Sequence, residues 1–173
     1  MTPDLRDWIP YRADFRSDTP QLHWCHTARR RLTAPFLDGD LTRLMSLPFN
    51  RAFEVITSVD DAARHLDEHA PLSPTAFIFH IGRCGSTLVS RILAADPCNR
   101  VLSEPAPFDA VVRAPLTRPV ERDDYHSWMR TVLGALSQPA AGETRLFVKL
   151  DSWGSVAAVE LDQAFPKVPW LFI

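Results

Sequence analysis

Lysine and glycine are both scarce in this chain of 173 residues. Only two of its 19 basic residues are lysines, Lys149 and Lys167, so a buried or catalytic lysine has few candidates. The six glycines are about half the number expected from an average usage of roughly 7%. Gly82 and Gly85 nevertheless lie only three positions apart. We therefore expect backbone freedom to matter in that segment.

Cysteine pairs and metal-ligand clusters are also missing. The three cysteines, Cys25, Cys84 and Cys98, form no Cys-x-x-Cys pair, which favours a reducing compartment. His23 and His26 flank Cys25, but no second half of a zinc site follows at a distance. Neither zinc nor another metal is therefore expected.

Membrane and nucleic-acid signals are absent as well. The N-terminus carries acidic residues early, and no stretch approaches the roughly 20 apolar residues that span a membrane. The formal net charge is −2, and the basic residues form no stripe. We expect a cytoplasmic protein that binds neither membranes nor nucleic acid.

The first 74 residues differ in pattern from the rest. Residues 1–74 consist of short segments broken by prolines, with a helix expected at 60–69 between an N-cap at Ser58 and a stop at Pro71. We predict that they form an irregular, partly helical elaboration packed on the main domain. The main domain is expected over 75–173.

Apolar runs of strand length alternate with helical patterns from residue 75 onward. Strands are expected at 76–81, 100–103, 145–150 and 168–173, and helices at 86–95, 123–138 and 152–165. This alternation predicts an α/β fold with a mainly parallel central sheet, of the three-layer P-loop type. Ligands of such sheets bind beyond the carboxyl ends of the strands. The turns after Ile81 and Ser103 and the strand end at Leu150 therefore indicate one crevice.

The glycine pair belongs to a loop placed between a buried strand and a helix. In that position backbone N–H groups and the positive end of the helix dipole can hold a phosphate. Arginine adds a fork of cationic donors, and serine and threonine add hydroxyls. The predicted phosphate-binding residues are Gly82, Arg83, Cys84, Gly85, Ser86 and Thr87. The alternative is a tight strand–helix turn without a ligand.

Two common phosphate loops do not fit this segment. The nucleoside-triphosphatase loop needs Gly-x-x-x-x-Gly-Lys-Ser/Thr, whereas only two residues separate Gly82 from Gly85 and Ser86 stands where lysine is required. The cysteine phosphatase loop needs five residues between cysteine and arginine, whereas six separate Cys84 from Arg91.

Residues 77–88 resemble the 5′-phosphosulfate loop of the sulfotransferase family, whose core is Lys/Arg-x-Gly-Ser/Thr-Thr. The matching residues are Arg83, Gly85, Ser86 and Thr87, while Cys84 stands where serine is more usual. The resemblance extends over about residues 75–173.

Two further segments resemble the same family. Residues 101–105 are similar to the stretch where protein-tyrosine and several bacterial sulfotransferases carry a glutamate base, which places Glu104 in that role. Residues 147–151 are similar to the strand that supplies a lysine in the tyrosylprotein branch, which corresponds to Lys149. The alternatives are a helix-capping role for Glu104 and an ordinary strand-end charge for Lys149. His80 is interpreted as a core histidine with satisfied hydrogen bonds.

The resemblance implies an enzyme that transfers a sulfuryl group from 3′-phosphoadenosine 5′-phosphosulfate (PAPS) to a hydroxyl, phenol or amine. The acceptor would be a small molecule or a peptide. Glu104 would accept its proton during an in-line displacement, and Arg83, Lys149 and the loop donors would stabilise the departing phosphate without a metal.

Family members also hold the 3′-phosphate through an arginine and a serine after the next strand. That strand corresponds to residues 168–173, where the sequence ends, so we expect a C-terminally truncated domain. Two other functions stay open: a kinase-like phosphotransferase that binds a nucleoside triphosphate, and a binding module without catalysis.

Overall fold

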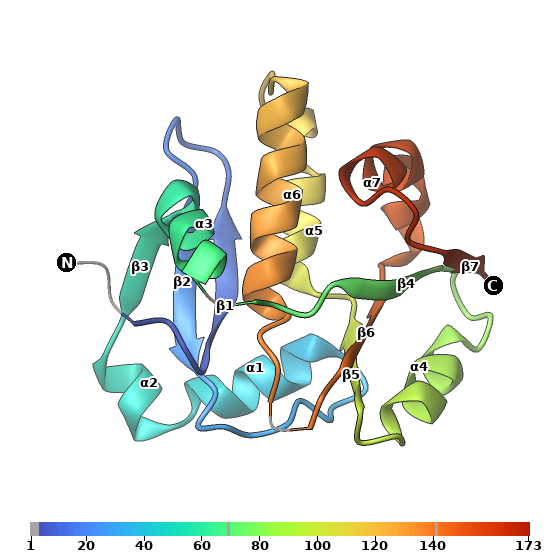
Figure 1. The fold of residues 1–173 in the computed structure, drawn as a ribbon, viewed down its shortest axis with the longest axis horizontal. Helices are drawn as coiled ribbons and strands as arrows, with labels where there is room; N and C mark the ends of the chain where they lie inside the picture. The colour runs from blue at the N-terminus through green and yellow to red at the C-terminus, as the bar shows by residue number, and fades with distance from the viewer. Residues whose placement is uncertain (1–3, 69, 141) are drawn as a thin grey trace.

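Two β-sheets and the helices around them make up the computed structural model, which describes residues 4–68, 70–140 and 142–173 (Figure 1). One sheet is antiparallel, with the strand order β1-β2-β3. The other has the order β5-β6-β4-β7, and all its neighbouring strands are parallel. The predicted α/β class with a parallel sheet is confirmed at this level.

The N-terminal region contains the antiparallel sheet, which the sequence analysis missed. Its strands are β1 (Trp8–Asp14), β2 (Gln21–His26) and β3 (Val55–Ser58), and the helices α1 (Leu37–Met45) and α2 (Pro48–Ala52) lie between β2 and β3. The prediction of an irregular, partly helical region is therefore wrong for these strands. A proline inside β1 concealed that strand. Pro10 is tolerated there because β1 is an edge strand whose register shifts between Pro10 and Arg12.

The helix predicted at 60–69 is α3 (Val59–Glu68), and its predicted end at His69 lies outside the described residues. Ser58 caps it as expected. The Ser58 hydroxyl accepts a hydrogen bond from the Asp61 backbone N–H at 3.0 Å and donates one to the Asp61 carboxylate at 2.7 Å.

The remaining elements follow the predicted strand–helix alternation. They are β4 (Pro74–Phe79), α4 (Ser86–Ala94), β5 (Asn99–Ser103), α5 (Ala106–Val112), η1 (Ala114–Leu116), α6 (Arg122–Leu136), β6 (Arg145–Lys149), η2 (Ser152–Ala157), α7 (Ala158–Ala164) and β7 (Trp170–Phe172). The four strands lie within two residues of their predicted bounds. The single helix predicted at 152–165 is instead a 3-10 turn followed by α7, and α5 was not predicted.

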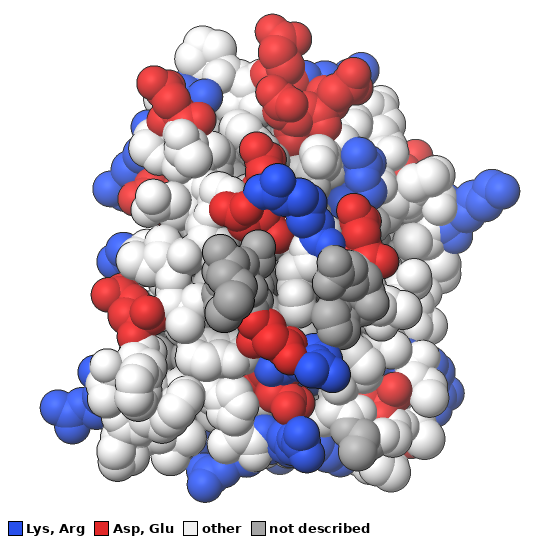
Figure 2. Space-filling model, turned by 60° about the vertical axis from the view of Figure 1, so that its left-hand side comes forward, with Lys and Arg blue, Asp and Glu red and all other residues white. Residues whose placement is uncertain are grey.

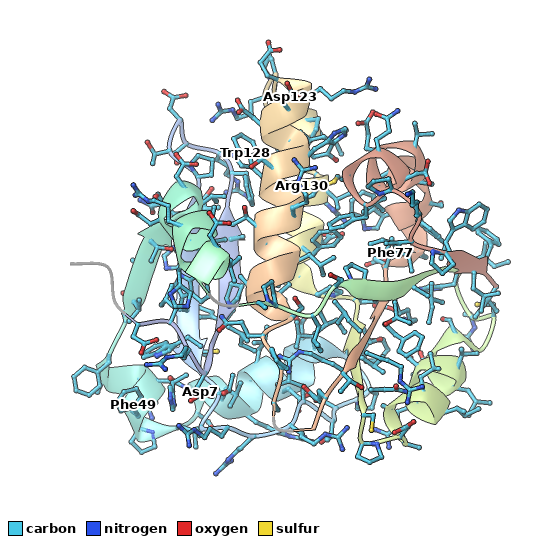
Figure 3. All side chains as sticks on the ribbon, viewed as in Figure 1. Asp7, Phe49, Phe77, Asp123, Trp128 and Arg130 are labelled. Carbon is cyan, nitrogen blue, oxygen red and sulfur yellow. The ribbon has the colours of Figure 1, made fainter. Side chains whose placement is uncertain are left out.

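Helix α6 packs between the two sheets together with α5 (Figure 1). Its apolar stripe is buried, and it comprises Trp128, Val132, Leu133 and Leu136. Trp128 lies on the side of α6 that faces the antiparallel sheet (Figure 3), where its ring is 5.2 Å from that of Phe15. The Tyr125 hydroxyl donates to the Val112 carbonyl at 2.8 Å and thereby fixes α6 to α5.

Charged side chains of both signs are interspersed on the face shown in Figure 2, without a continuous basic stripe there. Within the described ranges, no helix has both the length and the apolar character needed to cross a bilayer.

Cys25 on β2 is fully buried, and burial raises the pKa of its thiol to about 12. Since the thiolate is the reactive form, we expect Cys25 to resist a thiol reagent at pH 8 in the folded protein. Cys84 and Cys98, which are half-buried, should react first. Mass spectrometry of the labelled peptides, with and without denaturant, checks this order. Early labelling of Cys25 would contradict it.

Candidate functional site

The carboxyl ends of β4, β5 and β6 meet at one edge of the parallel sheet. Lys149, the last residue of β6, is opposite Ile78 on β4 and Ser103 on β5. Glu104 directly follows β5, and His80 directly follows β4. The predicted convergence of these strand ends is therefore present.

Lys149 and Glu104 form an ion pair at this edge. The Lys149 side chain is 0% exposed, and its Nζ donates to Glu104 Oε1. The backbone also joins the two residues, because the Glu104 N–H donates to the Lys149 carbonyl at 2.7 Å. Lys149 is thus a buried, paired cation and not an ordinary strand-end charge. Burial without a partner would be strongly unfavourable for it.

Glu104 adopts a left-handed backbone conformation, with φ of 50°. This conformation is uncommon for a residue with a side chain and is found preferentially at functional sites. It turns the chain out of β5 and into Pro105, the N-cap of α5. Among the described residues, no backbone N–H of α5 donates to the Glu104 carboxylate, so the capping alternative for Glu104 lacks its hydrogen bond.

His80 completes the group from the third strand end. Its Nε2 lies 3.0 Å from the Leu150 carbonyl and 3.6 Å from Glu104 Oε1, and its Nδ1 lies 3.0 Å from the Ile81 carbonyl. His80 is buried as predicted, and each ring nitrogen faces a carbonyl oxygen. A neutral imidazole has one N–H and can donate to only one of these two acceptors. The proximity of His80 to Glu104 was missed, since this contact depends on the cross-strand register and leaves no signal in the local sequence.

The predicted phosphate loop connects β4 to α4, and α4 begins at Ser86. Gly85 is its N-cap with φ of 91°, a conformation that favours glycine, and Arg83 has φ of 64°. The Gly85 carbonyl accepts the Leu88 N–H at 2.8 Å. The N–H groups that begin a helix have no partner within the helix, so this loop can offer donors to an anion.

The residues of the loop differ in their exposure to solvent. Gly82, Arg83 and Gly85 are exposed, Cys84 and Thr87 are half-buried, and Ser86 is buried. Arg83 forms no ion pair with any described residue. In particular, among the described residues, it pairs with none of the carboxylates, Glu104 included. The loop lies at the same end of the sheet as that pair because β4 is the neighbour of β6.

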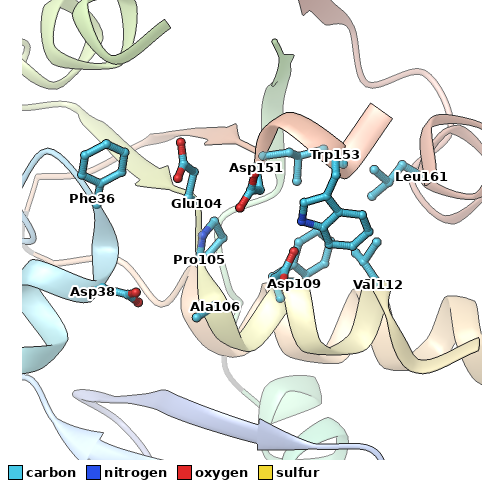
Figure 4. A pocket seen from close by; sticks show the side chains of 13 residues that line it. Phe36, Asp38, Glu104, Pro105, Ala106, Asp109, Val112, Asp151, Trp153 and Leu161 are labelled. Atoms are coloured by element: carbon cyan, nitrogen blue, oxygen red, sulfur yellow. The ribbon is translucent and has the colours of Figure 1, made fainter. Parts of the chain in front are cut away.

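A cavity of about 170 Å³ opens beside Glu104 (Figure 4). Phe36 and Asp38 from the N-terminal region form one wall, and the start of α5 and η2 form the others. The Phe36 ring centroid is 5.2 Å from Lys149 Nζ. Sequence reasoning gave no role to Phe36 or Asp38, because a long-range contact carries them to the site.

Within the described part of the chain, no three or more His, Cys, Asp and Glu side chains gather in a way that would hold a metal ion. Comparisons with protein-family models, curated proteins and solved structures found no match to this chain. The site itself consists of a carboxylate that is flanked by a buried lysine and a histidine. It lies next to a glycine loop at the start of a helix.

Proposed function

We propose that the chain has a sulfotransferase-like P-loop fold and transfers a sulfuryl group from PAPS to a hydroxyl, phenol or amine. The observation that supports this most is the buried Lys149–Glu104 pair at the strand ends beside the loop of residues 82–87. A glycine loop alone is only a weak indication of a sulfuryl-transfer site. A carboxylate and a buried cation at the same sheet edge supply the two roles that such a transfer needs.

Glu104 is the proton acceptor in this proposal. Its contacts with Lys149 Nζ and His80 Nε2 both use Oε1, and Oε2 has no partner among the described residues. Oε2 takes the proton of the acceptor as the acceptor oxygen or nitrogen bonds to sulfur. The sulfur–oxygen bond to the 5′-phosphate breaks in the same displacement, and its electron pair leaves with the phosphate.

Lys149 and Arg83 stabilise the charge that develops on the departing phosphate. Lys149 reaches this role by shifting its Nζ from Glu104 toward the phosphate, which also makes Glu104 a stronger base. Arg83 is exposed and without an ion-pair partner, so it can turn toward the loop ligand at little energetic cost. The loop N–H groups and the hydroxyls of Ser86 and Thr87 bind the phosphate oxygens.

Calorimetric titration with adenosine 3′,5′-bisphosphate, and separately with magnesium ATP, tests the donor. We expect the bisphosphate to bind and Arg83→Ala to weaken it by roughly 10- to 100-fold, the value of a charge-assisted hydrogen bond. Arg51→Ala is the matched control, because Arg51 is exposed on α2, outside the loop. Binding of ATP alone would support the kinase-like alternative and overturn the proposal.

A further inference from the structure

We propose that the cavity beside Glu104 binds the acceptor, and that this acceptor carries a positively charged ammonium group. The identification of the cavity as the acceptor site rests on the proposed function. The class of acceptor rests on the size, charge and aromatic walls of the cavity itself.

The size of the cavity limits what enters it. Its volume of about 170 Å³ is below the roughly 300–1,000 Å³ of sites for drug-sized ligands. It therefore takes a small molecule or one end of a larger acceptor. Apolar side chains surround this space, and they include Pro105, Phe108, Val112, Leu150 and Leu161.

Four carboxylates line this small space, those of Asp38, Glu104, Asp109 and Asp151, and no Lys, Arg or His is among the described lining residues. The negative charges of two of them are paired with cationic side chains that do not line the cavity. Glu104 pairs with Lys149, and Asp109 pairs with Arg113 at 2.9 Å.

The other two carboxylates have no such compensation. Asp38 and Asp151 form no ion pair with any described residue, and Asp151 accepts only the neighbouring Ser152 hydroxyl at 3.0 Å. The cavity thus has an excess of negative charge. A cation complements this excess, whereas a neutral or anionic acceptor does not.

The environment of Asp109 supports the same conclusion. Burial raises the pKa of its carboxyl, and the charge of Asp151 raises it further, whereas Arg113 and the Trp153 side chain lower it. A ligand ammonium between the two carboxylates would stabilise both in their ionised forms.

Aromatic side chains on both sides of the cavity also suit a cation. The Trp153 indole forms one wall, and Phe36 forms the opposite wall (Figure 4). The face of the Trp153 ring already attracts a cation, since the Arg113 guanidinium lies 4.1 Å from its centroid.

Trp153 also directs a hydrogen-bond donor at the carboxylates. Its Nε1 is buried and has no partner at normal hydrogen-bond geometry among the described residues, although its interaction with Asp109 lowers the pKa of that carboxyl. Figure 4 shows this nitrogen on the side of the ring that faces Asp109 and Asp151. An ammonium has no acceptor atom, so this donor does not itself recognise the ammonium. It helps to hold the Asp109 carboxyl in its ionised form, because it lowers the pKa of that group.

Tyramine and 4-ethylphenol test the proposal, because they share the ring and the hydroxyl and differ only in the ammonium group. Binding to the whole protein is measured by calorimetry without a sulfuryl donor. We expect tyramine to bind at least about tenfold more tightly than 4-ethylphenol. Asp151→Asn should remove most of this preference. Equal binding of the two phenols, or binding of neither, would overturn the proposal.

Asp109→Asn is a second variant, although it also breaks the pair with Arg113. Asp151→Asn avoids this problem because Asp151 has no ion-pair partner among the described residues. Asp162→Asn is the matched control, since Asp162 is exposed on α7 and does not line the cavity. An equal loss of tyramine preference in the control would also overturn the proposal.

Transfer assays separate this proposal from the proposed function. Selective binding of tyramine without any transfer from PAPS would leave the cation site in place and remove the sulfotransferase function. Transfer to 4-ethylphenol and tyramine with equal kcat/KM would support the sulfotransferase function and would remove the cation site.

Discussion

Glu104→Gln should lower the rate of sulfuryl transfer by about 10²–10⁴-fold and leave the binding of adenosine 3′,5′-bisphosphate close to that of the wild type. Glutamine keeps the shape of the side chain but cannot take a proton from the acceptor. The loop of residues 82–87, which we propose as the phosphate-binding part, is not altered by this change. The measurements are the initial rate with saturating donor and the calorimetric affinity for the bisphosphate.

The buried cation complicates this variant, because Glu104→Gln leaves Lys149 without its charged partner. Removal of one member of a buried pair costs about 3–5 kcal/mol. The melting temperature is therefore measured in parallel. Glu104→Gln combined with Lys149→Met removes both charges, so neither residue of the pair is left as a buried, uncompensated charge.

The single variant tests the base, and a folded Glu104→Gln protein with unchanged turnover would exclude Glu104 from that role. The double variant also lacks Lys149, which we propose to stabilise the departing phosphate, so its transfer rate does not isolate the base. It is used for the melting temperature, whose recovery would show that the buried charge destabilises the single variant.

The fold of residues 75–173 could be predicted well because its signals are local. The apolar runs of β4 and β6 have strand length, and α6 has a helical apolar stripe that is buried as expected. The N-terminal sheet could not be predicted in the same way. Pro10 interrupts the pattern of β1, and the pairing of β2 with β3 joins segments about 30 residues apart.

The residues of the candidate site likewise fall into those that the local sequence predicts and those that long-range packing brings in. Lys149 and Glu104 were expected at one sheet edge because carboxyl ends of parallel strands meet there. Phe36 reaches the cavity through the packing of a distant segment, which no local pattern encodes, whereas Trp153 lies three residues after the predicted strand end at Leu150. Ile92 on α4 is apolar and yet 64% exposed, so an apolar residue in a predicted helix is not by itself evidence of burial.

A second buried charge, Glu143, is expected to have the largest effect on stability. It precedes β6, and its side chain is 1% exposed. Its carboxylate accepts hydrogen bonds from Arg100 Nη1 at 2.9 Å and from the Ala140 N–H at 2.9 Å, and it lies 3.6 Å from Arg31 Nε. It thereby joins β5, the segment before β6 and the N-terminal region.

Glu143→Gln should reduce the free energy of unfolding by about 3–5 kcal/mol, because it removes the carboxylate that pairs with the buried Arg100 guanidinium and leaves only the more distant charge of Asp40 to compensate it. Arg100 is 3% exposed, and burial lowers its pKa against the opposing effect of Glu143. The Leu136 carbonyl, which accepts from Arg100 Nε at 3.0 Å, supplies no neutralising charge. Urea unfolding followed by circular dichroism measures the change.

Asp96→Asn is the matched control for Glu143→Gln. Asp96 pairs with Arg145, but both side chains are exposed by more than 40%, so about 0–1 kcal/mol should be lost. Equal losses in the two variants would show that the buried Arg100–Glu143 pair contributes no more to the free energy of unfolding than the exposed Asp96–Arg145 pair. Arg100→Met added to Glu143→Gln should recover part of the stability, because it removes the uncompensated charge. No recovery would mean that the lost hydrogen bond from the Ala140 N–H and the lost ion pair with Arg31, and not the buried charge of Arg100, account for the effect.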